Sequence, residues 1–513
     1  MKFGNRTVFL ALLLILVGVV LYACYPLLRP GFFVSDDGAW MIIRLSAFYQ
    51  SLREGQFPVR FLGRLNFGYG YPVANFLYPG FMYIGSVIHL LGFPFVSTVK
   101  IILGGSLITG TLFVYLWLRT YFKKIASAVG TIGFITAPYL LFDLYHRGSV
   151  GEILAIAAGA IGLYSIKAKK PWLFGIAVPL LIVSHNTVAL LFLGFYALYI
   201  SVLGAWRDYW VMFGTGMAMA AFFWIPALYE RKYVVFDSIA VSQPGTFFVQ
   251  NKDAALLGIA GLIAAIMSLF SGRQLRKEKI YFLCVAAGVI FLSTSVSASL
   301  WGLQGFAKFI QFPYRFLSLG IFTGAWLMAY AVEYGKKLFP VIVTVLCIGL
   351  GVWTIRTQIQ GIEPLTEPEG YYTTNEATTN VADEYMPKWV SIKPIVHASE
   401  RLLFYSGRGT ITPNVVTSQM VDVVVDAAEV SSLQINTVYY PGWGASVDDT
   451  QVRIDYANSE GVIRISVPAG THHVVVAFRE TISRFLADMV SLVGIALYVT
   501  MVIIGFLHKK KNK

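Results

Sequence analysis

Long apolar runs, separated by short polar or basic connectors, fill the first two thirds of the chain, and one more lies near its end. About 20 apolar residues are enough to cross the roughly 30 Å hydrocarbon core of a bilayer. Twelve runs approach this length: 8–28, 97–118, 125–145, 150–166, 172–186, 187–204, 208–229, 252–271, 279–297, 315–334, 338–355 and 484–507. The pattern predicts a polytopic α-helical membrane protein with about 12–13 transmembrane helices.

A further apolar run at 76–92 is the ambiguous one. If it crossed the membrane, the basic cluster Arg119, Lys123 and Lys124 would face outside, and every later loop would be inverted. We therefore expect it to lie in a long first outer loop, 29–96, as an interfacial or re-entrant segment packed on protein. Thirteen crossings are the alternative.

The pattern changes after residue 356. Short alternating or β-branched runs follow at 421–425, 433–440, 452–456, 462–467 and 473–478, separated by turn signals such as Pro441-Gly442 and Asp448-Asp449. This predicts a small extracytoplasmic β-sandwich-like domain. We expect a transmembrane domain over 1–355, a β-rich domain over 356–483, and a last helix with a basic cytoplasmic tail over 484–513.

Composition supports this interpretation. The 513 residues are 57% hydrophobic and 13% charged, with a net charge of +13. The basic residues gather in short loops between apolar runs, which is typical of cytoplasmic loops and argues against nucleic-acid binding. Such loops hold Lys167, Lys169, Lys170, Arg273, Arg276, Lys277, Lys279, Lys336 and Lys337. We expect a multi-pass protein of the cell membrane with both termini cytoplasmic, and the three scattered cysteines indicate no disulfide framework.

Two adjacent carboxylates, Asp36 and Asp37, follow the first apolar run. One could act as a general base on a hydroxyl group, with its pKa raised by its neighbour. Both could instead hold a divalent cation such as Mg²⁺ or Mn²⁺ through oxygen ligands. A third interpretation is a helix N-cap, because Ser35-Asp36-Asp37 precedes an amphipathic stretch over 39–52.

Other polar residues gather on the same predicted outer face. Arg60 and Arg64, four residues apart, could bind phosphate or reach lipid headgroups. His146, Arg147 and Glu152 lie in a short loop, where the arginine and the glutamate could simply pair.

Two further sites interrupt apolar sequence. His185 and Asn186 fall between two runs, where a histidine commonly makes an interhelical hydrogen bond. Lys308, Gln311, Tyr314 and Arg315 form a basic amphipathic segment suited to lipid headgroups or to a lipid-linked phosphate.

In their order along the chain, these motifs resemble the GT-C superfamily of membrane glycosyltransferases, and within it the bacterial YfhO-like and 6-pyruvoyl-tetrahydropterin synthase-related membrane proteins. The motifs are Ser35-Asp36-Asp37, 55–60, 68–72, His146-Arg147-Gly148 with Glu152, 312–316, and 382–387 before the β-domain. The resemblance implies inverting transfer of a sugar from a polyprenyl-phosphate donor to a cell-envelope glycan, lipid or protein, on the outer face.

Carried over by position, the resemblance makes Asp36 or Asp37 the base, Glu152 the second acid, and Arg315 the ligand of the lipid phosphate. Arg60, Arg147 and His185 are secondary site residues. Some members of the superfamily use a divalent cation and others do not.

Two other functions stay open. A transporter or flippase of lipid-linked glycans would also have many spans and intramembrane charges, although no paired broken helices are evident from the sequence. A non-catalytic envelope-assembly protein would depend on its β-domain rather than on the loop acids.

Overall fold

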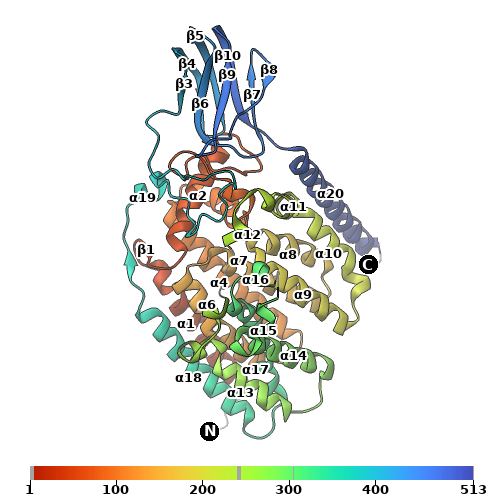
Figure 1. Ribbon diagram of the computed structural model, residues 1–513. Helices are drawn as coiled ribbons and strands as arrows, with labels where there is room; N and C mark the ends of the chain where they lie inside the picture. Colours follow the sequence, from red (N-terminus) through yellow and green to blue (C-terminus); the bar gives the residue numbers. More distant parts are fainter. Residues whose placement is uncertain (1–4, 240–243, 304–305, 512–513) are drawn as a thin grey trace.

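The computed structural model describes residues 5–239, 244–303 and 306–511. A helical body carries a β-domain at one end (Figure 1). Eight helices or helix pairs within this part of the chain are long and apolar enough to cross a membrane. They comprise α1 (Asn5–Leu28), α4 (Phe95–Arg119), α5 (Lys124–Ile135) with α6 (Pro138–Phe142), α7 (Val150–Lys167), α9 (Asn186–Leu203), α17 (Leu317–Tyr334), α18 (Phe339–Gln360) and α20 (Ile482–Lys511). The chain is thus a polytopic helical membrane protein, as predicted.

The other four predicted crossings have a more complex form. Two are bent helix pairs: α10 (Trp206–Met219) meets α11 (Ala221–Glu230) at 64°, and α14 (Arg276–Ser293) meets the segment 295–301 at 79°. Two are short apolar helices, α8 (Pro171–Ser184) and α13 (Ile259–Leu269). The bent pairs correct the expectation of uninterrupted runs, because apolarity alone does not reveal a break.

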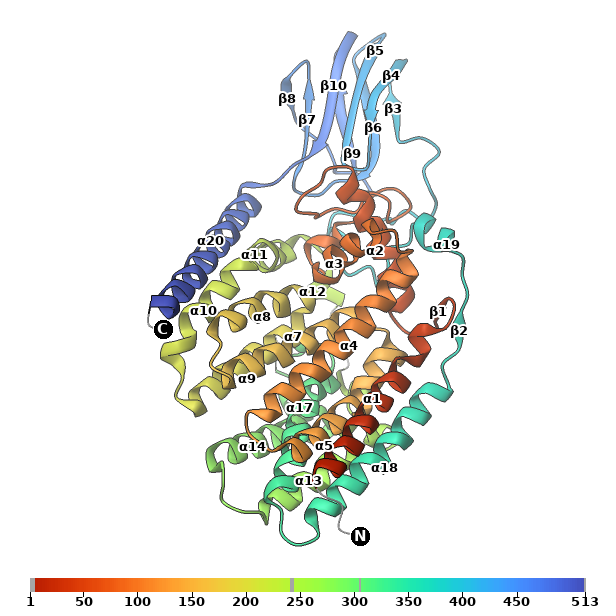
Figure 2. The ribbon, with the colours of Figure 1, turned by 180° about the vertical axis from the view of Figure 1, so that it is seen from behind.

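The ambiguous run at 76–92 forms the short helix α3 (Gly80–Leu90). Its 11 residues extend only about 16 Å at about 1.5 Å per residue, roughly half of a bilayer core. It lies beside α2 (Gly38–Arg53), near the β-domain (Figure 2). Its length agrees with its predicted place in the first outer loop.

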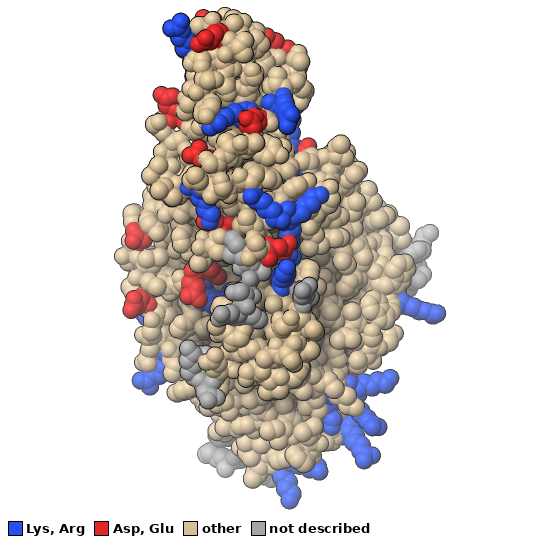
Figure 3. Space-filling model, in the orientation of Figure 1, with Lys and Arg blue, Asp and Glu red and all other residues tan. Residues whose placement is uncertain are grey.

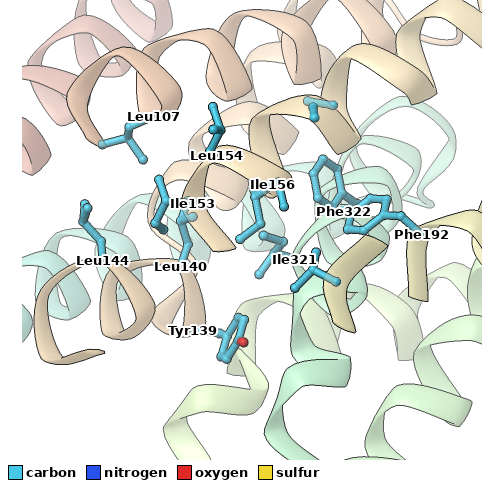
Figure 4. Packing of buried hydrophobic residues seen from close by; sticks show 14 of the residues in the cluster. Leu107, Tyr139, Leu140, Leu144, Ile153, Leu154, Ile156, Phe192, Ile321 and Phe322 are labelled. Atoms are coloured by element: carbon cyan, nitrogen blue, oxygen red, sulfur yellow. The ribbon is translucent and has the colours of Figure 1, made fainter. Parts of the chain in front are cut away.

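Helix α7 is the centre of the body. Its side chains Ile153 and Ile156 are buried, and they pack among residues of neighbouring helices (Figure 4). These neighbours include Leu107 of α4, Phe192 of α9 and Phe322 of α17. Because α7 is buried on nearly all sides, a polar residue in its first turn must find its partners inside the protein.

The β-domain contains two antiparallel sheets. One has the order β4-β5-β10-β7-β8 and the other β3-β6-β9. The strands are β3 (Leu402–Ser406), β4 (Gly409–Val416), β5 (Met420–Ala427), β6 (Ser431–Val438), β7 (Trp443–Val447), β8 (Thr450–Val452), β9 (Val462–Val467) and β10 (Gly470–Phe478). The predicted strand at 452–456 is wrong beyond Val452, and β3, β4 and β7 were not predicted. Asp448 and Asp449, both at positive φ, form the predicted turn between β7 and β8.

The chain between α18 and the β-domain is laid against the first outer loop. Strand β2 (Pro364–Leu365) pairs antiparallel with β1 (Phe32–Phe33). Helix α19 (Glu369–Thr374) then packs beside α2. Segments that are more than 300 residues apart therefore lie against each other.

Helix α20 is held by buried charges at its N-terminal end, which follows the β-domain. Arg484 donates two 2.8 Å hydrogen bonds to Glu230 of α11, and both side chains are buried. Arg60 of the first outer loop binds Glu480 at 3.1 Å and Asp488 at 2.9 Å. The last helix is thereby tied to both the loop and the bundle.

Candidate active site

The first outer loop and the 143–149 turn meet backbone to backbone. The amides of Asp36 and Asp37 donate to the carbonyl oxygens of His146 and Arg147, at 2.9 and 2.8 Å. Gly148 makes this approach possible: its φ is +63°, and an added Cβ would lie 2.9 Å from the backbone nitrogen of Gly38. The contact brings the Asp36-Asp37 motif against Arg147.

Glu152, in the first turn of α7, is the centre of the site. It is fully buried. Its Oε1 accepts hydrogen bonds from Arg147 Nη1 at 2.5 Å and Arg315 Nε at 3.1 Å. Its Oε2 accepts from the hydroxyl of Tyr139 at 3.1 Å. Buried charge of this kind is stable only when it is paired and hydrogen-bonded, and both conditions are met.

Arg147 is shared by three carboxylates. Besides Glu152, its Nη1 binds Asp143 Oδ1 at 2.7 Å, and its Nη2 lies 3.6 Å from Asp37 Oδ2. The simple alternative, a pair between Arg147 and Glu152, is therefore correct but incomplete. Asp143 is fully buried in the π-helical turn that leads to Gly148. It therefore helps to hold the guanidinium of Arg147 in place.

Arg315 reaches the same carboxylate from another direction. It lies in the 3₁₀ turn η7 (Pro313–Phe316), just before α17. Its Nη1 donates to Gln311 at 2.8 Å, to the carbonyl of Ile310 at 3.1 Å, and to Thr187 at 3.2 Å. The neighbouring Tyr314 ring lies 5.4 Å from the guanidinium carbon of Arg147, a cation–π contact.

His185 completes the inner surface of the site. Its Nδ1 accepts the amide of Val188 at 3.3 Å at the start of α9. The proton of a neutral ring is then on Nε2, which lies 3.4 Å from Glu152 Oε1. His185 therefore faces the site through this contact with Glu152 of α7, its side-chain hydrogen bond is the local one from Val188, and the ring also packs on Tyr78.

The two adjacent acids differ in environment. Asp37 occupies the N-cap position of α2, but its side chain makes no capping hydrogen bond within the described residues. Burial raises the pKa of Asp37, while the charges of Arg147 and Arg44 oppose that rise. Asp36 is exposed. Asp37, rather than Asp36, faces the arginine, so it is the better candidate for a base.

Several predicted site residues lie elsewhere. All three guanidinium nitrogens of Arg60 are taken up by Glu480, Asp488 and the carbonyl of Phe222, which is incompatible with a free phosphate ligand. Arg64 binds Ser46 and backbone carbonyl oxygens near α19, and burial lowers its pKa to about 10.

The remaining three predicted residues are peripheral. Asn186 donates to the carbonyl of Phe76 at 3.0 Å, while its neighbour His185 faces the site. Lys308 is exposed. His146 is exposed and stacks on Phe142, although its carbonyl contacts Asp36.

Tyr139, Asp143 and Arg44 are not among the site residues predicted from the sequence. Asp143 precedes Arg147 by four residues, a spacing that places two charges together in a helical turn and could have revealed it. Tyr139 and Arg44 carry no comparable signal, because their roles depend on the tertiary fold.

A cation at Asp36 and Asp37 would need other ligands. Across 5–239, 244–303 and 306–511, no group of three or more His, Cys, Asp or Glu side chains is arranged to hold a metal ion. A bound Mg²⁺ or Mn²⁺ would therefore complete its shell with water or substrate oxygens.

The comparisons with known proteins found structural similarity. No protein-family model and no curated protein matches the sequence. The chain is similar to the arabinofuranosyltransferase AftD from Mycobacteria, at 18% identity and a TM-score of 0.44, with 72% of this chain matched to 28% of that one.

It is also similar to the oligosaccharyltransferase of Archaeoglobus fulgidus in the apo form, at 14% identity and a TM-score of 0.40, with coverage of 74% and 57%. The structure of the archaeal oligosaccharyltransferase AglB from Archaeoglobus fulgidus with an inhibitory peptide and a dolichol-phosphate matches at 14% identity and a TM-score of 0.41, with coverage of 71% and 56%. The chain therefore spans less than 60% of the length of each of these proteins.

Proposed function

We propose that this protein is an inverting glycosyltransferase that moves a sugar from a polyprenyl-phosphate donor to a cell-envelope acceptor on the extracytoplasmic side. One observation carries the proposal: Asp37 lies beside Arg147, and Glu152 holds Arg147 and Arg315 together in a buried site. A base next to two fixed guanidiniums suits a reaction in which a hydroxyl group is deprotonated and a phosphate departs.

In the proposed reaction, Asp37 takes the proton of an acceptor hydroxyl. The hydroxyl oxygen then bonds to the anomeric carbon, on the face opposite the leaving group, so the configuration inverts. The bond between the anomeric carbon and the phosphate oxygen breaks, and its electron pair leaves with the lipid phosphate. Arg147 and Arg315 stabilise the charge that develops there, and Glu152 keeps both guanidiniums in place.

An apolar cavity of about 90 Å³ lies within the helical body. It is lined by parts of α13, α14, α17 and α18, and it includes Leu317 and Pro138. Leu317 is two residues from Arg315 and Pro138 is next to Tyr139, so apolar protein begins close to these site residues along the chain.

The charge distribution supports the proposed orientation. Lys and Arg side chains protrude at the end of the body opposite the β-domain (Figure 3). Because basic loops are retained in the cytoplasm, this end would face inward and the β-domain outward.

The broken helices are the one observation that favours a transporter. At the break between α10 and α11, however, the amide of Phe222 donates to Ser491 at 2.7 Å and its carbonyl accepts from Arg60 at 2.6 Å. These freed backbone groups are satisfied by protein, so this break does not supply a substrate site.

The test is sugar transfer by the purified protein in lipid nanodiscs, from a panel of polyprenyl-phosphate sugars to cell-envelope acceptors. We expect transfer by the wild type and its loss in Asp37→Asn that still folds. Transfer that is insensitive to Asp37→Asn and Glu152→Gln would reject the assigned site, and the absence of transfer from every donor would reject the function.

A further inference from the structure

Tyr78, in the first outer loop two residues before α3, packs against the site. The centroid of its ring lies 4.6 Å from that of His185. A Cβ added at Gly151, which immediately precedes Glu152, would lie 2.6 Å from Cδ2 of Tyr78. Because His185 Nε2 lies 3.4 Å from Glu152 Oε1, the ring of Tyr78 forms part of the wall of the site.

The hydroxyl group of Tyr78 has no hydrogen-bond partner among residues 5–239, 244–303 and 306–511. Its oxygen is not sealed from solvent, although the residue as a whole is only 6% exposed. Burial raises the pKa of Tyr78, so the hydroxyl stays protonated at neutral pH and can donate a hydrogen bond. A polar group in such a place is costly unless a ligand or water pairs with it.

Other hydrogen-bonding groups of the site also remain unused. Arg315 engages its protein partners through Nε and Nη1, and its Nη2 makes no hydrogen bond within the described part of the chain. The carboxylate of Asp37 has no hydrogen-bonded partner there either, and its side chain is 39% exposed. The site therefore offers a ligand two kinds of donor, the Tyr78 hydroxyl and the Arg315 guanidinium, besides the acceptor of Asp37.

The charges of the site act on the Tyr78 hydroxyl. After burial, which is the largest cause, Arg44 and Arg315 lower its pKa, whereas Asp37 and Glu152 raise it. The effect of a charge falls with distance. These influences agree with the contacts to His185 and Gly151, which place the ring beside the site.

We propose that the Tyr78 hydroxyl binds the phosphate of the lipid-linked donor, by donating a hydrogen bond to the anion that Arg315 Nη2 also binds. This inference rests on the proposed function for the identity of the ligand, and it adds a donor-binding residue to that site. A hydrogen bond to an anionic oxygen is stronger than one between neutral groups. Because the hydroxyl is neutral, it forms no ion pair with Asp37 or Glu152 and remains available to the ligand.

Binding of farnesyl phosphate to the full-length protein in nanodiscs tests the inference without any reaction. Isothermal titration calorimetry measures the affinity, with empty nanodiscs as the blank and farnesol as the same chain without a phosphate. We expect the wild type to bind farnesyl phosphate more tightly than farnesol. Tyr78→Phe keeps the ring against His185 and Gly151 and removes only the hydroxyl. Its affinity for farnesyl phosphate should fall about tenfold, the usual scale of a hydrogen bond to a charged group, with farnesol binding unchanged.

Tyr83→Phe is the matched control. Tyr83 lies in the same outer loop, and its hydroxyl already accepts a hydrogen bond from the amide of Val59 at 3.1 Å. This variant should bind farnesyl phosphate as the wild type does. Equal affinity in the wild type and Tyr78→Phe, or no preference of the wild type for the phosphate over farnesol, would overturn the inference.

Sugar transfer separates the inference from the proposed function. Tyr78→Phe should raise the donor KM and leave the acceptor KM unchanged. Phosphate binding that needs Tyr78 in a protein that transfers no sugar would preserve this subsite and reject the proposed function. Transfer by the wild type, with the same donor KM in Tyr78→Phe, would retain the function and reject the inference.

Discussion

Asp37 and Arg147 are joined twice: the amide of Asp37 donates to the carbonyl of Arg147 at 2.8 Å, and its carboxylate lies 3.6 Å from the guanidinium. The backbone bond sets the separation of the two loops. The side-chain contact, which is longer than a hydrogen bond, leaves Asp37 room to bind another donor. The backbone amide of Asp37 thus sets its position, and its carboxylate stays available to bind another donor.

The first prediction separates the two adjacent acids. Asp37→Asn removes the proposed base and should lower kcat at least 100-fold, which is the usual scale of general-base catalysis at about 10²–10⁴-fold. Asp36→Asn, the matched control, alters an exposed side chain and should retain most activity. Initial rates at saturating donor and acceptor provide the measurement, and the reverse ranking would contradict the assignment.

The second prediction concerns pH. Burial raises the pKa of Asp37. Activity should therefore increase with pH, and the midpoint of this increase should lie above the ordinary pKa of about 3.9 for aspartate. Arg147→Gln removes a charge that lowers this pKa, so the midpoint should move to higher pH in any residual activity. A pH–rate profile that falls over this interval, or a midpoint unmoved by the substitution, would exclude Asp37 as the titrating group.

The raised pKa of Asp37 also affects stability, which should fall with rising pH whereas activity should increase. The native state holds the Asp37 proton more tightly than the unfolded state, so this carboxyl group favours folding at low pH. Its contribution is lost as pH rises from the ordinary pKa through the raised one. As pH rises across this interval, the unfolding temperature should therefore fall less for Asp37→Asn than for the wild type.

The third prediction tests the central role of Glu152. Glu152→Gln leaves two buried guanidiniums without their shared carboxylate and should cost about 3–5 kcal/mol of stability, with loss of transfer. Arg147 keeps Asp143, so adding Arg315→Gln removes the charge that is left without a carboxylate. We expect this double variant to recover part of the unfolding temperature and none of the activity. Recovery of activity would mean that Arg315 serves packing alone.

The fourth prediction concerns Gly148. Gly148→Ala places a Cβ 2.9 Å from the backbone nitrogen of Gly38 and separates the loop of Asp37 from Arg147. Gly204 has a similar φ of +66°, but no atom lies within 4 Å of its added Cβ. Gly204→Ala should therefore carry only the left-handed backbone cost of about 1–2 kcal/mol and keep its activity. Equal activity in the two variants would show that the close approach is unimportant.

The fifth prediction concerns the attachment of α20. Arg484→Met leaves Glu230 buried without its cation and should cost about 3–5 kcal/mol. Lys123→Met breaks an ion pair with Glu333 in which the lysine side chain is 88% exposed, and it should cost less than about 1 kcal/mol. Denaturation in detergent measures both. A double variant, Glu230→Gln with Arg484→Met, should be more stable than Arg484→Met alone.

The sequence predicts the helices well because the length of an apolar run is itself the requirement for crossing a bilayer. It also indicates five residues that the fold brings together: Asp37, Arg147, Glu152, His185 and Arg315. It could not separate Arg315 from Arg60, because an arginine near a membrane surface has the same local pattern whether it faces a substrate or a buried acid. Only the position of α20, more than 400 residues away, decides that Arg60 is a structural residue.

Those distant contacts determine when the site can form. Asp37 is synthesised and inserted early. Its loop, however, is fixed by Thr379, Glu480 and Asp488, which are synthesised near the end. Formation of such nonlocal contacts is slow and must await the whole chain. During biosynthesis, Asp37 is therefore in place before the residues that fix its loop exist. A ribosome-bound or truncated chain that inserts correctly would still lack an assembled site.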